Sequence, residues 1–154
     1  MEVAASLQCP GSRDRLAAIV SDLSTYPKWL DIVANAEAEG ADPTGVEAEG
    51  VEDDAPTWMV ELRGQLGPLR RTKRLRMQRT LWSEDRIVFE RRERDGRDHS
   101  QWILAGDLSE PAPGLVELNM TMTYGGSLWI PVLDRLLADE IRRSRDRLAA
   151  LVTA

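Results

Sequence analysis

The stretch that decides the fold of this chain is residues 115–152, LVELNMTMTYGGSLWIPVLDRLLADEIRRSRDRLAALV. Its first ten residues alternate between apolar and polar side chains, which is typical of a β-strand with one buried face. After Gly125-Gly126 the apolar period becomes that of an α-helix, from about Trp129 almost to the C-terminus. Such a helix needs an apolar surface to cover its stripe, so we predict a sheet that holds it. The predicted stripe comprises Ile130, Leu133, Leu137, Ile141, Ser144, Leu148 and Val152.

The rest of that sheet is predicted from turn signals and from the same period of two. From Thr57 onward, turns are expected at Gly67-Pro68, Ser83 to Asp85, Asp95-Gly96 and Pro111 to Gly114, which leaves five strands. Because alternate side chains of a strand share a face, the alternation also assigns the inner side of the sheet. The predicted inward residues are Trp58, Val60, Leu62, Leu75, Met77, Arg79, Leu81, Ile87, Phe89, Arg91, Trp102, Leu104, Val116, Leu118, Met120, Met122 and Tyr124.

The N-terminal third adds two strands and two short helices. Glu2 to Gln8 is expected to be a strand, and Ser12 is expected to cap a helix that a second short helix through Trp29 follows. Ile32 to Glu39 is strand-like, and the acidic stretch Gly40 to Pro56 is expected to be a mobile loop or ragged hairpin. The prediction is an α+β domain spanning residues 1–154: a curved seven-stranded antiparallel sheet wrapped around one long C-terminal helix, with two short helices after strand 1.

Length and charge narrow the function classes. The net charge of −6 argues against nucleic acid as a partner, and the apolar runs are too short for a transmembrane segment. With the single cysteine Cys9 and no charged-then-apolar leader, a cytoplasmic location is expected. The basic stretch Arg70 to Arg79 is interpreted as a solvated strand face balanced by Glu61, Glu90 and Glu93, with binding to an anionic surface as the alternative. The oligomeric state, monomer or homodimer, stays open.

Catalytic and metal motifs are missing from the sequence. His99 is the only histidine and Cys9 the only cysteine, and they have no ligand spacing, so we expect no metal and no cofactor. His99 is expected to be an exposed turn residue rather than a general base. No G-x-S-x-G, G-x-G-x-x-G or phosphate-binding Gly-Lys-Thr motif occurs, which argues against the common hydrolase, dinucleotide and nucleotide sites.

The segment from Asp22 to Trp29, DLSTYPKW, resembles the D-x-x-x-Y-P-x-W helix pair of the polyketide cyclase/dehydrase and START-like superfamily, also called SRPBCC. Four further places are similar to actinobacterial members of that superfamily: the run from Phe89 to Arg91, Trp102, the stretch from Tyr124 to Trp129 and the stretch from Asp139 to Ser144. The resemblance covers nearly the whole chain. It implies a helix-grip fold with a ligand cavity between the sheet and the C-terminal helix, but no single activity, because carriers, receptors and aromatase/cyclases share the scaffold.

Two inward arginines are the candidates for a polar site. Arg79 and Arg91 need a partner because an unpaired buried guanidinium is costly, and the partner is either Glu140 or an anionic group of a ligand. With Tyr124, they are also the catalytic candidates that the resemblance to aromatase/cyclases implies. The predicted ligand-binding set is Trp58, Met77, Arg79, Phe89, Arg91, Trp102, Met120, Met122, Tyr124, Leu133, Leu137 and Glu140.

Three functional hypotheses follow. The first is binding or transport of a small hydrophobic or amphipathic molecule, lipid-like or polyketide-like, with the arginines at its polar end. The second is an aromatase/cyclase-type enzyme in which Arg79, Arg91 and Tyr124 steer enolate chemistry, although no convincing base is present. The third is a protein-interaction module that uses the basic strand and the acidic loop.

Overall fold

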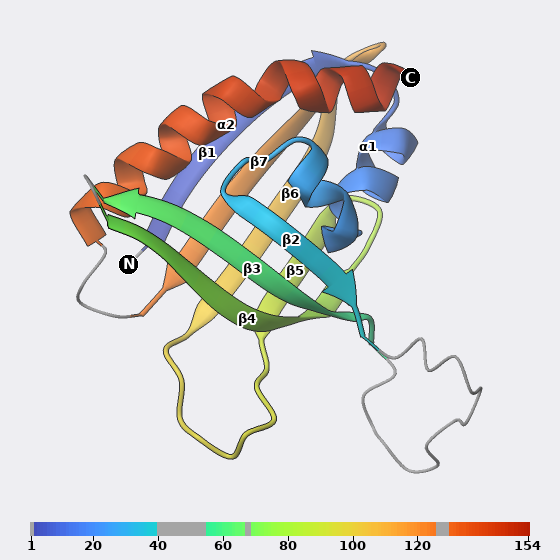
Figure 1. The fold of residues 1–154 in the computed structure, drawn as a ribbon. Coiled ribbons are helices and arrows are strands. Elements are labelled where there is room, and N and C mark those ends of the chain that lie inside the picture. Colours follow the sequence, from blue (N-terminus) through green and yellow to red (C-terminus); the bar gives the residue numbers. More distant parts are fainter. Residues whose placement is uncertain (1, 40–54, 67–68, 126–129) are drawn as a thin grey trace.

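The computed structural model describes residues 2–39, 55–66, 69–125 and 130–154, with side chains for all of these except 64–66, 69–71 and 130–138. Its strands and helices follow the predicted order (Figure 1). They are β1 (Glu2–Pro10), α1 (Arg13–Val20), the 3-10 helix η1 (Leu23–Lys28), β2 (Val33–Ala38), β3 (Thr57–Leu66), β4 (Leu69–Trp82), β5 (Arg86–Arg91), β6 (Trp102–Ala112), β7 (Leu115–Tyr124) and α2 (Ile130–Thr153).

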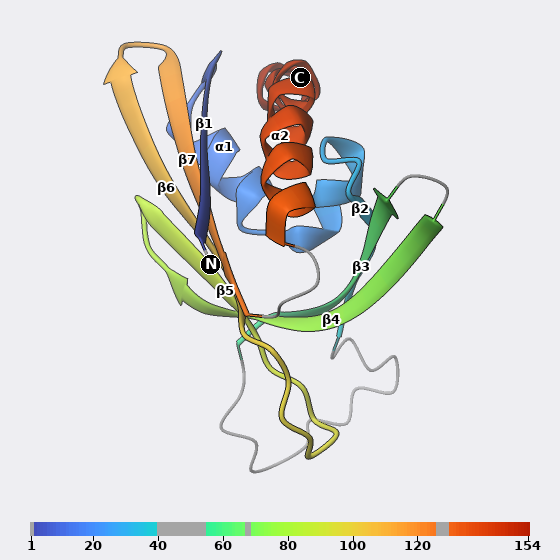
Figure 2. The same ribbon diagram turned by 90° about the vertical axis from the view of Figure 1, so that its left-hand side faces the viewer.

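The strands form one antiparallel seven-stranded sheet in the order β1-β7-β6-β5-β4-β3-β2. Figure 2 shows α2 nearly end-on in the hollow of this curved sheet, with α1 and η1 beside it. Strands β1, β5, β6 and β7 form one wall of the hollow, and β2, β3 and β4 form the other. The predicted α+β arrangement, a curved sheet wrapped around a C-terminal helix with two short helices after the first strand, is confirmed.

The predicted inner face is confirmed for most of the sheet. Leu118 pairs with Leu7 on one side and with Leu108 on the other, and all three side chains are buried. The same alternation buries Trp58 and Val60 on β3. Buried inward residues on the remaining strands are Leu75, Met77, Ile87, Phe89, Trp102, Val116, Met120 and Tyr124.

A β-bulge in β4 makes one inward assignment wrong. Arg79 pairs with Phe89, whereas Leu81 pairs with Val88, so β4 contributes one residue more than β5 between these pairs. The extra residue moves Leu81 off the face of Arg79, and its side chain is 44% exposed. A strictly alternating pattern cannot locate such an insertion.

The outer face is less wet than the alternation predicts. Arg76 and Gln78 belong to the predicted polar set, yet both are buried. Arg76 donates from Nε to Glu39 at 2.8 Å and from Nη1 to the Arg92 carbonyl at 2.7 Å. Glu39 follows the end of β2, two strands away in the sheet, and Arg92 follows the end of the neighbouring β5, so neither belongs to the cross-strand pair of Arg76 with Met59.

Capping side chains fix the two short helices. Ser12 accepts from the Arg15 backbone N–H at 3.1 Å, as predicted, and Asp22 accepts from the Ser24 N–H at 3.0 Å at the start of η1. Tyr26 and Trp29 follow within η1 and at its C-cap, where both are buried and their ring centroids lie 4.7 Å apart. The DLSTYPKW segment therefore closes one end of the core.

The last turns of α2 carry the predicted apolar stripe, since Ile141, Ser144, Leu148 and Val152 are buried. The side chains of the earlier stripe positions, residues 130–137, lie outside the described part of the chain. Gly11, in the turn after β1, has a φ of +145°, and a Cβ there would lie 2.2 Å from Cγ1 of Val152. A side chain at position 11 would thus overlap Val152 unless one of the two segments shifts.

The predicted turns at 83–85, 95–96 and 111–114 are confirmed. The turn at 67–68 lies outside the described residues, as does nearly all of the predicted acidic loop, of which only residues 55 and 56 are described. No helix in the described part is long and apolar enough to cross a bilayer. The assignment of the whole chain to one domain stays a prediction.

Candidate ligand cavity

A cavity of about 70 Å³ lies on the concave side of the sheet, bounded by strands, η1 and the described part of α2. Every strand except β5 contributes a described side chain to its wall. All of these side chains are apolar or aromatic: Val3, Leu23, Tyr26, Leu30, Ile32, Val33, Val60, Leu62, Leu75, Met77, Trp102, Leu104, Met120, Met122 and Ile141.

The concave side is not packed as tightly as a filled core. Five of the lining side chains retain accessible surface and are only half-buried: Val3, Ile32, Leu62, Leu104 and Met122. Leu104 and Met122 lie directly opposite each other on β6 and β7, and Met122 also pairs with Val3 on β1. Three adjacent strands therefore present incompletely covered apolar side chains to the same hollow.

Four of the predicted ligand contacts line this cavity, namely Met77, Trp102, Met120 and Met122. Trp58 and Phe89 instead pack against each other in the adjacent core, with ring centroids 5.6 Å apart and planes at 78°.

Tyr124 is buried beside Trp102 at a centroid distance of 5.6 Å. Of Leu133 and Leu137 the structure describes the backbone alone. Their role as ligand contacts stays a proposal, as it does for the whole predicted set.

The segment from η1 to β2 is the part of the wall that the sequence reasoning did not select. Tyr26, Leu30 and Ile32 line the cavity from this segment. The phenol of Tyr26 donates to the Val20 carbonyl at 2.8 Å, and burial raises its pKa well above the ordinary value. The DLSTYPKW motif carries the signal, because its tyrosine and tryptophan are both buried, but the resemblance assigns this motif to the fold and not to the ligand contacts.

Arg79 has a partner within the protein. Its Nη1 donates to the carbonyl of Ser21 at 3.1 Å, at the C-cap of α1, and its guanidinium lies 4.1 Å from the ring centroid of Trp82. Partial burial lowers its pKa, and the charge of Asp22 opposes that shift. The arginine therefore ties β4 to α1, and it is not among the residues that line the cavity.

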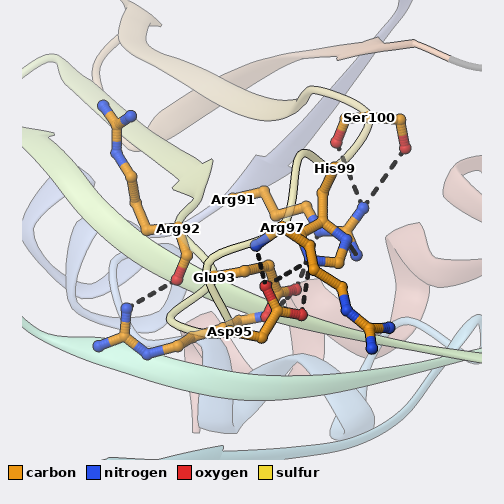
Figure 3. A network of polar contacts seen from close by, with 8 residues as sticks. Arg91, Arg92, Glu93, Asp95, Arg97, His99 and Ser100 are labelled. Carbon is orange, nitrogen blue, oxygen red and sulfur yellow. Dashed lines mark hydrogen bonds and ion pairs between the residues drawn. The ribbon is translucent and has the colours of Figure 1, made fainter.

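Arg91 also finds its partners in the protein, at the end of β5 (Figure 3). Its Nε donates to Glu93 at 2.9 Å, and its Nη1 lies 3.3 Å from the Ser100 carbonyl. Nη2 faces Nδ1 of His99 at 3.3 Å, and Nε2 of the same ring lies 2.7 Å from Asp95. Since an arginine only donates, a hydrogen bond from Nη2 requires Nδ1 to accept, and Nε2 then donates to Asp95.

That network belongs to the β5–β6 connection and not to the apolar cavity. It lies along a second, polar hollow of about 340 Å³, lined by residues between Glu90 and Ile103, of which Trp102 also lines the apolar cavity. Figure 3 shows Arg91, Glu93 and Asp95 converging beneath His99 and Ser100. His99 is exposed, as predicted, and its position in a loop agrees with the predicted turn.

The expectation that Glu140 neutralises Arg79 or Arg91 is wrong. Glu140 is buried on α2, where it accepts from the Asp31 backbone N–H and lies 3.5 Å from Arg143 and 3.6 Å from Arg147. Arg147 in turn pairs with the Asp31 carboxylate. Helical spacing places all three α2 side chains on the flank that faces the η1–β2 connection, so the cluster fastens α2 there and leaves the sheet arginines to other partners.

The described residues offer no metal centre, because they contain no group of three or more His, Cys, Asp or Glu arranged to hold an ion. Two fully buried side-chain donors within them lack hydrogen-bond partners: Nε1 of Trp29 and Nε1 of Trp102. Trp102 lines the cavity, and the ammonium of Lys73 lies 5.5 Å from its ring centroid. Among the described lining side chains, the indole N–H of Trp102 is therefore the one buried polar group without a hydrogen-bond partner, and it carries no charge.

Comparison with known proteins identifies the fold. No protein-family model matches the sequence, and no curated protein matches it. Among solved structures, a START superfamily protein from Mycobacterium smegmatis matches with a TM-score of 0.69 at 15% identity, over 99% of this chain and 97% of the other. A protein from Thermus thermophilus matches with a TM-score of 0.68 at 16% identity, over 99% and 97%.

A third similar structure is StfQ, described as a di-domain ARO/CYC from the steffimycin biosynthetic pathway. It matches with a TM-score of 0.62 at 14% identity, over 99% of this chain and 50% of that chain. At such identities the likeness concerns the fold. This chain has the START-like fold, in the form that polyketide cyclases share, and the resemblance found in its sequence is confirmed at that level.

Proposed function

From the START-like fold and the wholly apolar described wall of its cavity, we propose that this protein binds a small hydrophobic or amphipathic molecule, lipid-like or polyketide-like, between the sheet and α2. The observation that carries the proposal is the set of half-buried apolar side chains on three adjacent strands, which include Val3, Leu104 and Met122. Exposed apolar surface inside a hollow is stabilised by an apolar guest, at roughly 25 cal/mol per Å² covered.

The cavity must widen to accept such a guest. Its volume of about 70 Å³ is smaller than the roughly 300–1,000 Å³ typical of pockets that hold drug-sized ligands. Three methionines in the wall, Met77, Met120 and Met122, suit this requirement, because an unbranched thioether side chain changes rotamer at low cost. The closed cavity corresponds to a state that ligand binding displaces in favour of a wider one.

An aromatase/cyclase activity has less support. The arginines that the hypothesis needs, Arg79 and Arg91, hydrogen-bond to the protein and are not among the lining residues. The one titratable group in the described wall, the Tyr26 phenol, is engaged by a carbonyl, and burial raises its pKa. The described wall therefore supplies apolar contact rather than a general acid or base.

A protein-interaction role for the basic strand also has less support, because two of its four described cations, Arg74 and Arg76, already pair with acidic side chains. Arg74 lies 3.7 Å from Glu61, as the sequence predicted, and Arg76 is buried against Glu39. The predicted partners Glu90 and Glu93 instead pair with Arg92 and Arg91. Internal pairing lowers the charge that this face offers to a partner.

The proposal is tested with N-phenyl-1-naphthylamine, a neutral naphthalene dye whose fluorescence rises in apolar surroundings. We expect saturable binding to the full chain, and a loss of about tenfold or more in affinity for Met122→Trp, which fills the cavity from β7. Thr123→Trp is the matched control, because the next residue of the strand points to the opposite face and leaves the cavity unchanged.

A second variant with a tryptophan in the cavity keeps the test decisive if Met122→Trp does not fold. Leu104→Trp introduces the same bulk from β6, directly opposite Met122, and thermal unfolding identifies which variants remain folded. Dye binding that is absent in the parent protein, or equal in the parent and in both folded filled variants, would overturn the proposed function.

A further inference from the structure

The chemistry of the described cavity wall restricts which guests it can hold. None of the described lining side chains carries a charge, and the one hydroxyl among them, that of Tyr26, is committed to the Val20 carbonyl. The indole N–H of Trp102 has no partner within the described residues, and it is neutral. A guest thus meets apolar surface and at most one uncharged donor.

Lys73 is the described cation nearest to a lining ring, with its ammonium 5.5 Å from the ring centroid of Trp102, but the residue is exposed and is not among the lining residues. The charged groups that the sequence suggested for the site are engaged in other contacts. Arg79 binds the Ser21 carbonyl, and Arg91 binds Glu93 and Ser100. Glu140 lies next to the lining residue Ile141, but its carboxylate accepts from the Asp31 N–H and lies between two arginines. Turning any of these groups toward a guest would break contacts that keep a buried charge compensated.

An ionised guest would therefore lose its hydration without gaining a counter-charge or a charge-assisted hydrogen bond from the described wall. Such a transfer is strongly unfavourable, and a titratable guest avoids it by entering in its neutral form. We propose that the cavity selects uncharged apolar molecules, such as hydrocarbons, esters and neutral terpenoid-like or lipid-like compounds, and excludes organic anions. This inference rests on the proposed function, because it names the ligand class of the same cavity.

The test compares two dyes that share one ring system. N-phenyl-1-naphthylamine is neutral, whereas 1-anilinonaphthalene-8-sulfonate carries a permanent sulfonate. We expect the anionic dye to bind the cavity at least about 100-fold more weakly at pH 7.5. Cavity binding is defined as the dye binding that both Met122→Trp and Leu104→Trp abolish and that Thr123→Trp retains. This definition separates it from binding of the sulfonate to surface arginines.

A natural pair of guests gives an independent readout. Laurate and methyl laurate displace the neutral dye in competition, and only laurate titrates. Because the neutral acid is the form that enters, the apparent affinity of laurate should fall by about tenfold per pH unit between pH 6 and 8. The affinity of methyl laurate should stay constant over the same range.

The outcomes separate the two proposals. If the two dyes bind the cavity within about threefold of each other, or if laurate competes equally at pH 6 and 8, the selection for uncharged guests is wrong while the cavity remains a binding site. If neither dye binds in a cavity-dependent way, the proposed function fails, and the inference fails with it.

Discussion

Replacement of Gly11 by alanine tests how tightly the end of α2 is held against the turn after β1. The Cβ of an alanine would lie 2.2 Å from Cγ1 of Val152, a side chain that is only 1% exposed and has little room to move. The φ of +145° adds a backbone penalty that glycine does not incur. We expect the backbone to cost about 1–3 kcal/mol and the overlap a further 1–3 kcal/mol, so the variant loses about 2–6 kcal/mol of unfolding free energy.

Urea unfolding followed by circular dichroism measures this loss, and two further variants assign its cause. Gly114→Ala shares a positive φ but has open space around its Cβ, so it should lose only the backbone part, about 1–2 kcal/mol. Val152→Ala removes the methyl group that the new side chain meets. In that background, Gly11→Ala should also cost only the backbone part, which gives a coupling of about 1–3 kcal/mol between positions 11 and 152.

Two results would refute this reasoning. One is a loss for Gly11→Ala no larger than that for Gly114→Ala, which would mean that the end of α2 yields freely. The other is a coupling below about 0.5 kcal/mol, which would mean that the cost has a source other than Val152.

Two further predictions concern the cluster that joins α2 to the η1–β2 connection. Glu140→Ala leaves the partly buried Asp31 N–H without its acceptor and should lower the unfolding free energy by about 1–3 kcal/mol. The control is Asp139→Ala at the exposed neighbouring position, which should change the unfolding free energy by no more than about 0.5 kcal/mol. Equal losses for the two variants in urea unfolding would contradict the stabilising role of Glu140. The hydrogen bond from Arg147 lowers the pKa of Asp31, so this carboxylate contributes stability above its unfolded pKa of about 4 that is lost as the pH falls further. The stability difference between the parent and Asp31→Asn should therefore shrink from pH 6 to pH 2.5, and a constant difference would show that the pair does not contribute.

The cavity wall combines residues that strand alternation predicts with residues that it cannot predict. Alternation placed Met77, Trp102, Met120 and Met122 on the concave side, and all four line the cavity. It could not show that the segment around Tyr26 folds back to complete the wall, because that contact joins residues far apart in the chain.

The pairing of charges was the least predictable feature. The sequence predicts that Glu140 pairs with the sheet arginines. A carboxylate on the flank of a helix instead binds the N–H groups that lie nearest to it in the tertiary structure. Those groups come from Asp31, Arg143 and Arg147.

Local sequence patterns were sufficient for the order of strands and helices, most inward faces and the START-like fold, because period, turn residues and caps act over a few neighbouring residues. The bulge beyond Arg79, the burial of Arg76 and the partners of Arg91 became visible only in three dimensions. The physical reason is that one inserted residue changes a register without changing the composition of the strand. Ion pairs, likewise, depend on distances between strand ends that no local pattern encodes.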